Sequence, residues 1–225
     1  MVIPPFPDPR TANHDGLVAI GGDLSIPTLL AAYRSGIFPW PDPDYPDILW
    51  ASPIERGVLE FASLHIPRSL RKERERTTWR FTVDTAFEHV IDACAEATVQ
   101  TGRDLTWIVP AMRRAYIDFH RAGHAHSVEV WEGEELVGGL YGVAVDGIYA
   151  GESMFHRRPN ASKLALLHLI DHLRARGAEW IDIQMLTPHM ATLGARGVPR
   201  DEFLTMLERG RNPERILFAP RAASE

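Results

Sequence analysis

Residues 147–184 read GIYAGESMFHRRPNASKLALLHLIDHLRARGAEWIDIQ, and this stretch predicts the centre of the fold. Its pattern is a strand, a polar turn, an amphipathic helix that ends at Gly177, and a second, shorter strand. A strand–helix–strand unit of this kind normally brings its two strands together in one sheet. We therefore expect the chain to be organised around two neighbouring strands that are joined by one helix.

Three polar side chains interrupt these otherwise apolar strands. Glu152 stands between Gly151 and Ser153 in the first strand, and Asp182 and Gln184 lie two residues apart in the second. Side chains two apart in a strand leave the same face of the sheet. A carboxylate inside a core strand is costly unless it is paired or has a chemical role. Each group alone could be structural, as when Glu152 pairs with an arginine, but three of them on one unit favour a functional site.

The bulk composition describes an ordinary globular protein. The chain has 225 residues, 45% of them hydrophobic, which suits one large domain or one domain with a small appendage. The single cysteine, Cys94, lies in the apolar run FEHVIDACAEA and is expected to be a buried, inert thiol. The sequence contains neither an apolar stretch of about 18 residues nor a signal-peptide pattern, so we expect a soluble, cytoplasmic protein.

The net charge of −6 gives no global sign of nucleic-acid binding, but one segment reverses the sign. Residues 68–76 read RSLRKERER, with five basic residues against two glutamates. Such a cluster can contact several phosphates of a nucleic acid, each weakly and in a salt-dependent way. The alternative is a solvated helix with internal Glu–Arg pairs, which composition alone favours.

The other segments supply a predicted order of elements. Ser25 is a candidate N-cap for a helix that ends at Gly36, and the residues before it are too rich in proline and glycine for regular structure. A proline- and aromatic-rich loop follows at 37–53. Gly142, with two other glycines in the same predicted strand, indicates a bulge or a close approach. The further elements are strands at 57–61, 80–83, 125–131, 136–145 and 148–155, helices at 68–76, 85–97 and 109–123, and, after residue 184, a short helix, a loop and a final helix.

The predicted elements occur in the order of the acyl-CoA N-acetyltransferase (GNAT) type of fold. This order is a meander of strands, a long helix, a strand beside the meander and a further helix. We therefore predict an α+β protein with an acetyltransferase-like, GNAT-type catalytic domain at residues 63–225. Residues 1–62 are expected to form a small N-terminal α/β lobe that packs against it.

Several common catalytic motifs are missing from the sequence. There is no GxxxxGK[ST] phosphate loop, no HExxH or CxxC pair and no GxSxG nucleophile elbow. His168 and His172 would share a helix face, but no third ligand at a suitable spacing accompanies them, so we expect no metal. The turn HRRPNASK lacks the glycines with which an acetyltransferase binds the pyrophosphate of CoA, which argues against an acetyl-CoA enzyme.

Runs of sequence from about residue 16 to residue 200 resemble one family, the leucyl/phenylalanyl-tRNA–protein transferases of the bacterial N-end rule. The chain departs from the family where SPIERG replaces the common SPDPR run, keeping Ser52, Pro53 and Arg56, and where Leu140 replaces a frequent methionine. The runs that carry the resemblance are GLVAIGGDLS, LLAAYRSGIFPW, SLHIPRSL, TWI, GHAHSVEVW, ELVGGLYGVA, GESMF, NASKLALL, IDIQ and HMATLGA followed by VPR.

The resemblance implies an aminoacyltransferase that moves Leu, Phe or Met from aminoacyl-tRNA onto the N-terminal Arg or Lys of an acceptor protein. The product would carry a residue that marks it for N-end rule degradation. The family also implies a small N-terminal domain, an acetyltransferase-like C-terminal domain, and no metal or organic cofactor. We expect the protein to act as a monomer, away from membranes.

The same resemblance assigns catalytic roles to the three polar residues. Gln184 would lie beside the attacking amine and accept its proton or a hydrogen bond, while Asp182 polarises Gln184. Glu152 would hold an ammonium group, of either the donor amino acid or the acceptor. Because a glutamine is a weak base, positional catalysis or help from the ribose 2′-hydroxyl stays open.

Substrate contacts are expected on apolar, aromatic and basic side chains. The amino-acid pocket would be walled by Leu140, Leu169 and Ile181, with Tyr33 nearby by family match. Tyr116 is a further expected substrate contact, and the adenine would stack on Trp40 or Trp107. The expected phosphate contacts are Arg68, Arg71, Lys72 and Arg76, although Glu73 and Glu75 would weaken them.

Two other classes of function compete with this interpretation. An acyl-CoA N-acetyltransferase is favoured by the strand order and opposed by the HRRPNASK turn, and binding of CoA would distinguish it. A non-catalytic tRNA-binding module is suggested by residues 68–76, and turnover of a labelled leucyl-tRNA with an Arg-starting peptide would exclude it.

Overall fold

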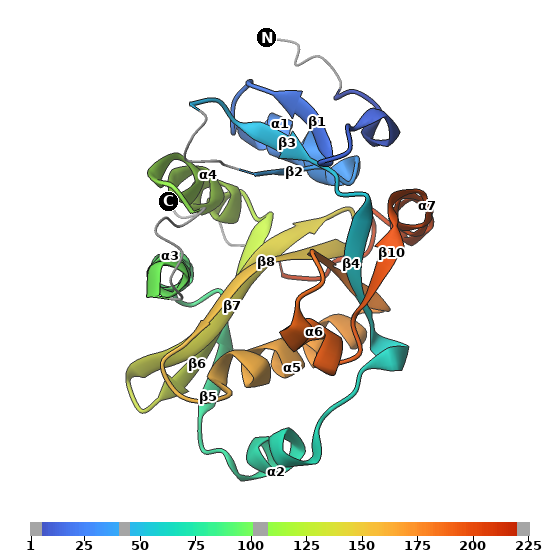
Figure 1. Cartoon of the computed structure of the whole chain (residues 1–225). Coiled ribbons are helices and arrows are strands. Elements are labelled where there is room, and N and C mark those ends of the chain that lie inside the picture. The colour runs from blue at the N-terminus through green and yellow to red at the C-terminus, as the bar shows by residue number, and fades with distance from the viewer. Residues whose placement is uncertain (1–5, 41–45, 101–107, 220–225) are drawn as a thin grey trace.

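The computed structural model describes residues 6–40, 46–100 and 108–219. An N-terminal lobe holds a small antiparallel sheet of order β1-β3-β2, with the helix α1 beside it (Figure 1). The sequence analysis expects no regular structure before the helix that ends at Gly36 and a loop at 37–53, and both expectations are wrong where these three strands form. The strands are too short for their periodicity to show, and Pro39 is tolerated because β2 lies at the sheet edge. The elements are β1 (Leu17–Ile20), α1 (Ile26–Arg34), β2 (Phe38–Pro39) and β3 (Leu49–Ala51).

The larger part of the protein is a seven-stranded sheet of order β10-β4-β9-β8-β7-β6-β5. All neighbouring strands are antiparallel except β8 and β9, which are parallel. The strands are β4 (Glu55–Glu60), β5 (Arg80–Val83), β6 (Ala125–Glu132), β7 (Glu135–Val145), β8 (Ile148–His156), β9 (Trp180–Gln184) and β10 (Arg196–Pro199).

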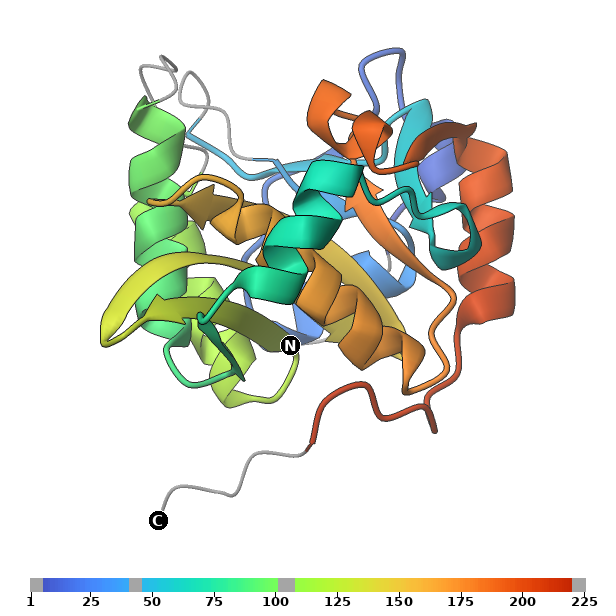
Figure 2. The same ribbon diagram turned by 90° about the horizontal axis from the view of Figure 1, so that it is seen from below.

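Helices cover both faces of this sheet (Figures 1 and 2). The helix α5 packs on one face, where its apolar side chains share a core with those of β6, β7 and β9. The helices α3 and α4 cover the other face and share a second core with α1 and the N-terminal lobe. The helices are α2 (Arg68–Arg76), α3 (Phe87–Gln100), α4 (Pro110–Arg121), α5 (Ala161–Arg174), α6 (Pro188–Thr192) and α7 (Arg200–Gly210).

The predicted strand–helix–strand unit is confirmed as β8, α5 and β9, with the two strands side by side. Their parallel pairing rests on one residue pair, Ala150 opposite Asp182. The two strands therefore separate beyond this point, and the separation leaves room between them. The strands predicted at 125–131, 136–145 and 148–155 are confirmed as β6, β7 and β8.

Two elements differ from the sequence-based expectations in their place in the fold. The sequence predicts a loop after α6, but residues 196–199 form β10 at the edge of the large sheet, opposite β4. The expected lobe of residues 1–62 includes β4, yet β4 is hydrogen-bonded between β9 and β10. The chain therefore passes from the small sheet to the large sheet between β3 and β4, before residue 62.

Cys94 lies on α3 and is fully buried, and burial raises the pKa of its thiol to about 12. The prediction of a buried thiol is confirmed, and the raised pKa agrees with the expectation that it is unreactive. Within the described residues, no helix is long and apolar enough to cross a membrane.

Candidate active site

Glu152 projects from a bulge in β8. Opposite this strand, Tyr141 of β7 pairs with Ser153 and Gly142 pairs with Gly151, so Glu152 has no partner across the ladder. A Cβ atom at Gly142 would lie only 2.3 Å from the carbonyl oxygen of Ala150, so the bulge requires glycine there. The glycines at 138, 139 and 142 predicted a bulge or a close approach in β7; the pairing of β7 with β8 is indeed irregular at Gly142, but the extra residue lies in β8. The bulge redirects a carboxylate at the point where β8 and β9 separate.

Three donors converge on the Glu152 carboxylate from distant parts of the chain. The Tyr33 hydroxyl donates to Oε1 at 2.7 Å, and the Gln184 Nε2 donates to the same oxygen at 2.8 Å. The Tyr116 hydroxyl donates to Oε2 at 3.3 Å and is also hydrogen-bonded to the Tyr33 hydroxyl. Tyr33 comes from α1 and Tyr116 from α4, so the site joins the N-terminal lobe to the large sheet.

Burial raises the pKa of the Glu152 carboxyl to about 7, and the nearby charge of Asp182 acts in the same direction. Hydrogen bonds from Tyr33 and Tyr116 and the charge of Arg56 oppose this rise. Burial and the Glu152 charge also raise the pKa values of both tyrosines well above their ordinary value. The hydroxyls therefore stay protonated as donors, while the carboxyl can gain or lose a proton near neutral pH.

Asp182 and Gln184 lie near each other but have different partners. The Asp182 carboxylate accepts two hydrogen bonds from the buried Arg56 of β4, at 2.8 and 2.6 Å. It also accepts the backbone N–H of Gln184 at 2.8 Å, whereas the Gln184 side chain turns to Glu152. The expected contact of Asp182 with Gln184 thus runs through the main chain, and the side-chain partner of Gln184 is Glu152.

An apolar cavity of about 220 Å³ opens beside Glu152, between the separating strands and the helix α5. All three predicted wall residues, Leu140, Leu169 and Ile181, line it. A smaller cavity of about 140 Å³ adjoins the first and is lined by Trp40 and Gln184. The residues common to both linings are Glu152, Ile183, Met185 and Thr187.

The structure thus brings together eight of the predicted site residues around two adjoining cavities. Trp107, the other predicted adenine platform, lies outside the described residues. Sequence reasoning did not assign a role to Arg56, which lies just before the strand predicted at 57–61; the only signal was its retention in the run that resembles the family. The eight are Tyr33, Trp40, Tyr116, Leu140, Glu152, Leu169, Ile181 and Gln184.

The predicted basic helix is confirmed as α2, which rests on the outer side of α5 through the buried Leu70 (Figure 2). Arg74 pairs with Asp171 of α5, and Glu73 accepts a hydrogen bond from Asn160. The other four cations of α2 are exposed, and no ion pair with another described residue accompanies them: Arg68, Arg71, Lys72 and Arg76.

Residues 58–208 match the family model of the leucyl/phenylalanyl-tRNA protein transferases, and residues 22–54 match the model of their N-terminal domain. The chain belongs to the leucyl/phenylalanyl-tRNA protein transferase family. Within this family it is 50% identical to a transferase of Anaeromyxobacter dehalogenans strain 2CP-C, over 92% of this chain and 88% of the relative. It is 49% identical to a transferase of Shewanella baltica strain OS185, over 92% of this chain and 87% of the relative.

Comparison with solved structures adds little to this family assignment. The C-terminal DUF2156 domain of an Agrobacterium fabrum protein aligns with 75% of this chain and 55% of its own, at 11% identity and a TM-score of 0.42. Similarity at this level carries no argument about the fold or the activity of this transferase family member.

Proposed function

We propose that this protein transfers leucine and phenylalanine from aminoacyl-tRNA to the N-terminal Arg or Lys of acceptor proteins. Its family membership supports this activity. The observation that carries the proposal is the position of Glu152, which borders both an apolar cavity and a second, more polar cavity that contains Gln184. An amino-acid side chain in the first cavity and an amine in the second would meet at this carboxylate.

The reaction is aminolysis of an ester. The acceptor α-amine attacks the carbonyl carbon of the aminoacyl ester, a C–N bond forms and the C–O bond to the ribose breaks. The proton that the amine loses is passed on to the ribose oxygen, so the tRNA leaves with a free hydroxyl group. An ester is already activated, so the enzyme must position the two substrates, accept the proton and stabilise the oxyanion. No covalent nucleophile is needed, which agrees with the inert Cys94.

The hydrogen bonds suggest a division of labour among the polar residues. Because Gln184 donates its Nε2 to Glu152, its carbonyl oxygen is available to accept a hydrogen bond from the attacking amine. With a pKa of about 7, Glu152 is better suited to take the proton than Asp182, whose two oxygens are held by Arg56. We assign Asp182 to the support of Gln184.

The apolar cavity suits an unbranched or γ-branched amino-acid side chain. Leu140, Leu169 and Ile181 offer it only apolar contacts, and such cavities discriminate weakly among similar shapes. We therefore include methionine among the transferred residues. The adenine would stack on Trp40, beside the smaller cavity.

The exposed cations of α2 are proposed to contact tRNA phosphates, and their freedom from internal ion pairs within the described structure supports this role. Replacing Arg68, Arg71 and Arg76 by alanine should weaken tRNA binding and reduce the slope of log K against log salt by about 0.9 for each lost contact. Arg74→Ala is the matched control, because Arg74 already pairs with Asp171. An unchanged slope in the triple variant would mean that α2 is only a solvated helix.

The finer fold assignment is also a proposal. An antiparallel meander of β6, β7 and β8, followed by α5 and the parallel strand β9, supports a GNAT-type catalytic domain. A monomeric state and the marking of products for N-end rule degradation stay predictions.

A transfer assay tests the main proposal. The protein is incubated with tRNA that carries labelled phenylalanine or leucine and with a peptide that begins with Arg, Lys or, as a control, Ala. We expect label on the Arg and Lys peptides only. Labelling of neither peptide, together with stabilisation by CoA, would contradict the proposal in favour of an acyl-CoA enzyme.

A further inference from the structure

Arg56 is the most deeply enclosed charge near the site, with 1% of its surface exposed. Its guanidinium contacts two aromatic rings, with Cζ 4.6 Å from the centroid of Phe38 in β2 and 4.5 Å from that of Phe203 in α7. Contact with two rings restricts the orientation of the planar group and contributes cation–π attraction. The two rings therefore restrict the direction of the guanidinium N–H groups independently of their hydrogen-bond acceptors.

Every nitrogen of the guanidinium has an acceptor. Nε and Nη2 donate to the two oxygens of Asp182, and Nη1 donates at 3.2 Å to the carbonyl oxygen of Gly36 in the N-terminal lobe. Asp182 is itself 4% exposed, and its Oδ1 also accepts the backbone N–H of Gln184 at 2.8 Å. The contacts form a chain from Arg56 through Asp182 to the main chain of Gln184.

The backbone at Gln184 is in an unfavourable conformation. Its φ is +60°, in the left-handed region that residues other than glycine rarely adopt. The N–H of Met185 donates to the carbonyl oxygen of Ile183 at 2.6 Å, so a hydrogen bond closes over Gln184 alone. A three-residue turn with a positive central φ is the rare and strained form of the γ-turn. Such conformations persist only where surrounding contacts hold them.

We propose that Arg56 is a positioning residue that holds the strained turn at Gln184 through Asp182, so that the Gln184 amide meets Glu152. Its importance for the rate rests on the proposed function, but its effect on the Gln184 conformation does not. The bond from Nη1 to Gly36 and the stacking on Phe38 also set the N-terminal lobe against β9. That lobe carries Tyr33, which donates to Glu152 from the other side.

Stability alone does not explain this buried ion pair. Two charges lose their hydration on burial, and replacing such a pair by apolar residues of similar volume is often neutral or stabilising. An apolar pair, however, could not accept the Gln184 N–H or define the register of the turn. The directional hydrogen bonds of the pair are what the site requires.

The test compares Arg56→Lys with Arg200→Lys. A lysine at 56 keeps the positive charge but has no planar fork, so it cannot serve both Asp182 oxygens and Gly36 together. Arg200 is a matched control, since it is half-buried in α7 and donates to the carbonyl oxygens of Ser52 and Pro53, away from Asp182 and Gln184. Both variants are expected to lose some thermal stability.

Two measurements are made on each folded protein. The side-chain NH₂ signals of Gln184, assigned by their loss in Gln184→Ala, report its hydrogen bond in ¹⁵N spectra. Steady-state transfer gives kcat and KM for both substrates. In Arg56→Lys we expect the Gln184 signals to move and kcat to fall at least about 10-fold, with KM within about 2-fold. Arg200→Lys should leave the signals and kcat as in the wild type.

Asp182→Asn provides a second variant if Arg56→Lys does not fold. The amide has nearly the shape of the carboxylate, but in either orientation its NH₂ donor faces a nitrogen of Arg56, and in the place of Oδ1 it also faces the Gln184 N–H, so the same changes are expected. Unmoved Gln184 signals in the folded variant overturn the inference, and so does failure of both variants to fold, which would mean that the pair holds the whole fold. A wild type without transfer activity, in which the signals still respond to Arg56→Lys, would refute the proposed function alone.

Discussion

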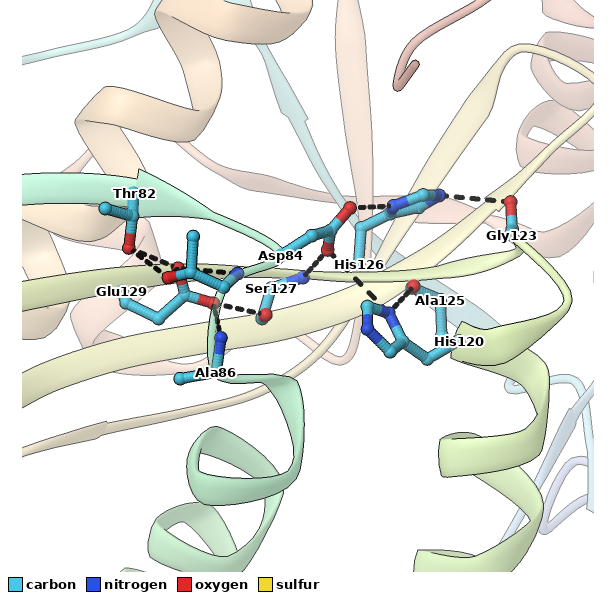
Figure 3. A network of polar contacts seen from close by, with 10 residues as sticks. Thr82, Asp84, Ala86, His120, Gly123, Ala125, His126, Ser127 and Glu129 are labelled. Carbon is cyan, nitrogen blue, oxygen red and sulfur yellow. Dashed lines mark hydrogen bonds and ion pairs between the residues drawn. The ribbon is translucent and has the colours of Figure 1, made fainter. Parts of the chain in front are cut away.

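Two glutamates of the same sheet, Glu152 in β8 and Glu129 in β6, show what separates a reactive carboxylate from a structural one. Glu129 is fully buried and accepts hydrogen bonds from Thr82 and Ser127 at 2.5 Å each (Figure 3). Thr85 and the backbone N–H of Ala86, just before α3, donate to it as well. These hydrogen bonds satisfy the Glu129 carboxylate and tie β6 to the residues that open α3.

Glu152 differs from Glu129 because it lies next to open space. It has three side-chain donors, but it borders two cavities, whereas Glu129 lines neither of them. Burial without enough donors raises the pKa of Glu152 to about 7. The comparison shows that burial of a carboxylate does not itself define a site. What matters is an incomplete set of donors next to space for a ligand.

The same substitution at the two positions should therefore have opposite consequences, and the larger effect is on activity. Glu152→Gln removes the group that holds or deprotonates the amine, so kcat/KM for transfer should fall about 100-fold. The melting temperature should not decrease, because an unfavourably buried charge is lost. Steady-state transfer and a thermal melt measure the two quantities. Near-normal transfer would remove Glu152 from the chemistry and break the comparison.

The cavity beside Glu152 is the second distinguishing feature, and Leu169→Ala tests it. Loss of apolar contact should raise the activation free energy for transfer from leucyl-tRNA by about 1–3 kcal/mol, and kcat/KM should fall accordingly. The ratio of leucine to phenylalanine use should change at the same time, as measured by competition between the two aminoacyl-tRNAs. An unaltered ratio would make Leu169 a core residue only.

Glu129→Gln should affect stability and leave the chemistry intact. The amide places a donor against the hydroxyl and N–H donors that surround the carboxylate, which costs about 1–3 kcal/mol in the free energy of unfolding. Urea denaturation measures this cost, and transfer by the folded fraction should match the wild type. A stable Glu129→Gln protein with low kcat would place a second carboxylate in the reaction.

The smallest expected effect is a pH dependence of stability that belongs to Glu152. Its pKa is about 7 in the folded protein and 4.5 as an ordinary glutamate, so the folded state binds more protons between these values. Stability should therefore decrease as pH rises from about 5 to about 7, relative to Glu152→Gln. Denaturant titrations of both proteins across this range measure the difference. A difference that is independent of pH would mean that the carboxyl titrates normally.

Local patterns along the chain determined much of this protein. The alternation and helical period of residues 147–184 were enough to predict β8, α5 and β9, and the glycines of β7 predicted a bulge or a close approach, which is found at Gly142 beside the bulge that aims Glu152. The walls of the apolar cavity, such as Leu169, follow from family resemblance and lie where expected. The strands and the helix depend on residues close together in sequence, whose periodicity records which faces are buried.

Only the tertiary structure decided which polar side chains become hydrogen-bond partners. Arg56 meets Asp182 across 126 positions of sequence, and Tyr33 meets Glu152 across 119. Glu129 alternates with apolar residues as an exposed side chain would, yet it is fully buried, because helices cover both faces of the sheet. Pairing between distant segments leaves no periodic trace in either segment, so a local pattern cannot tell a satisfied carboxylate from a reactive one.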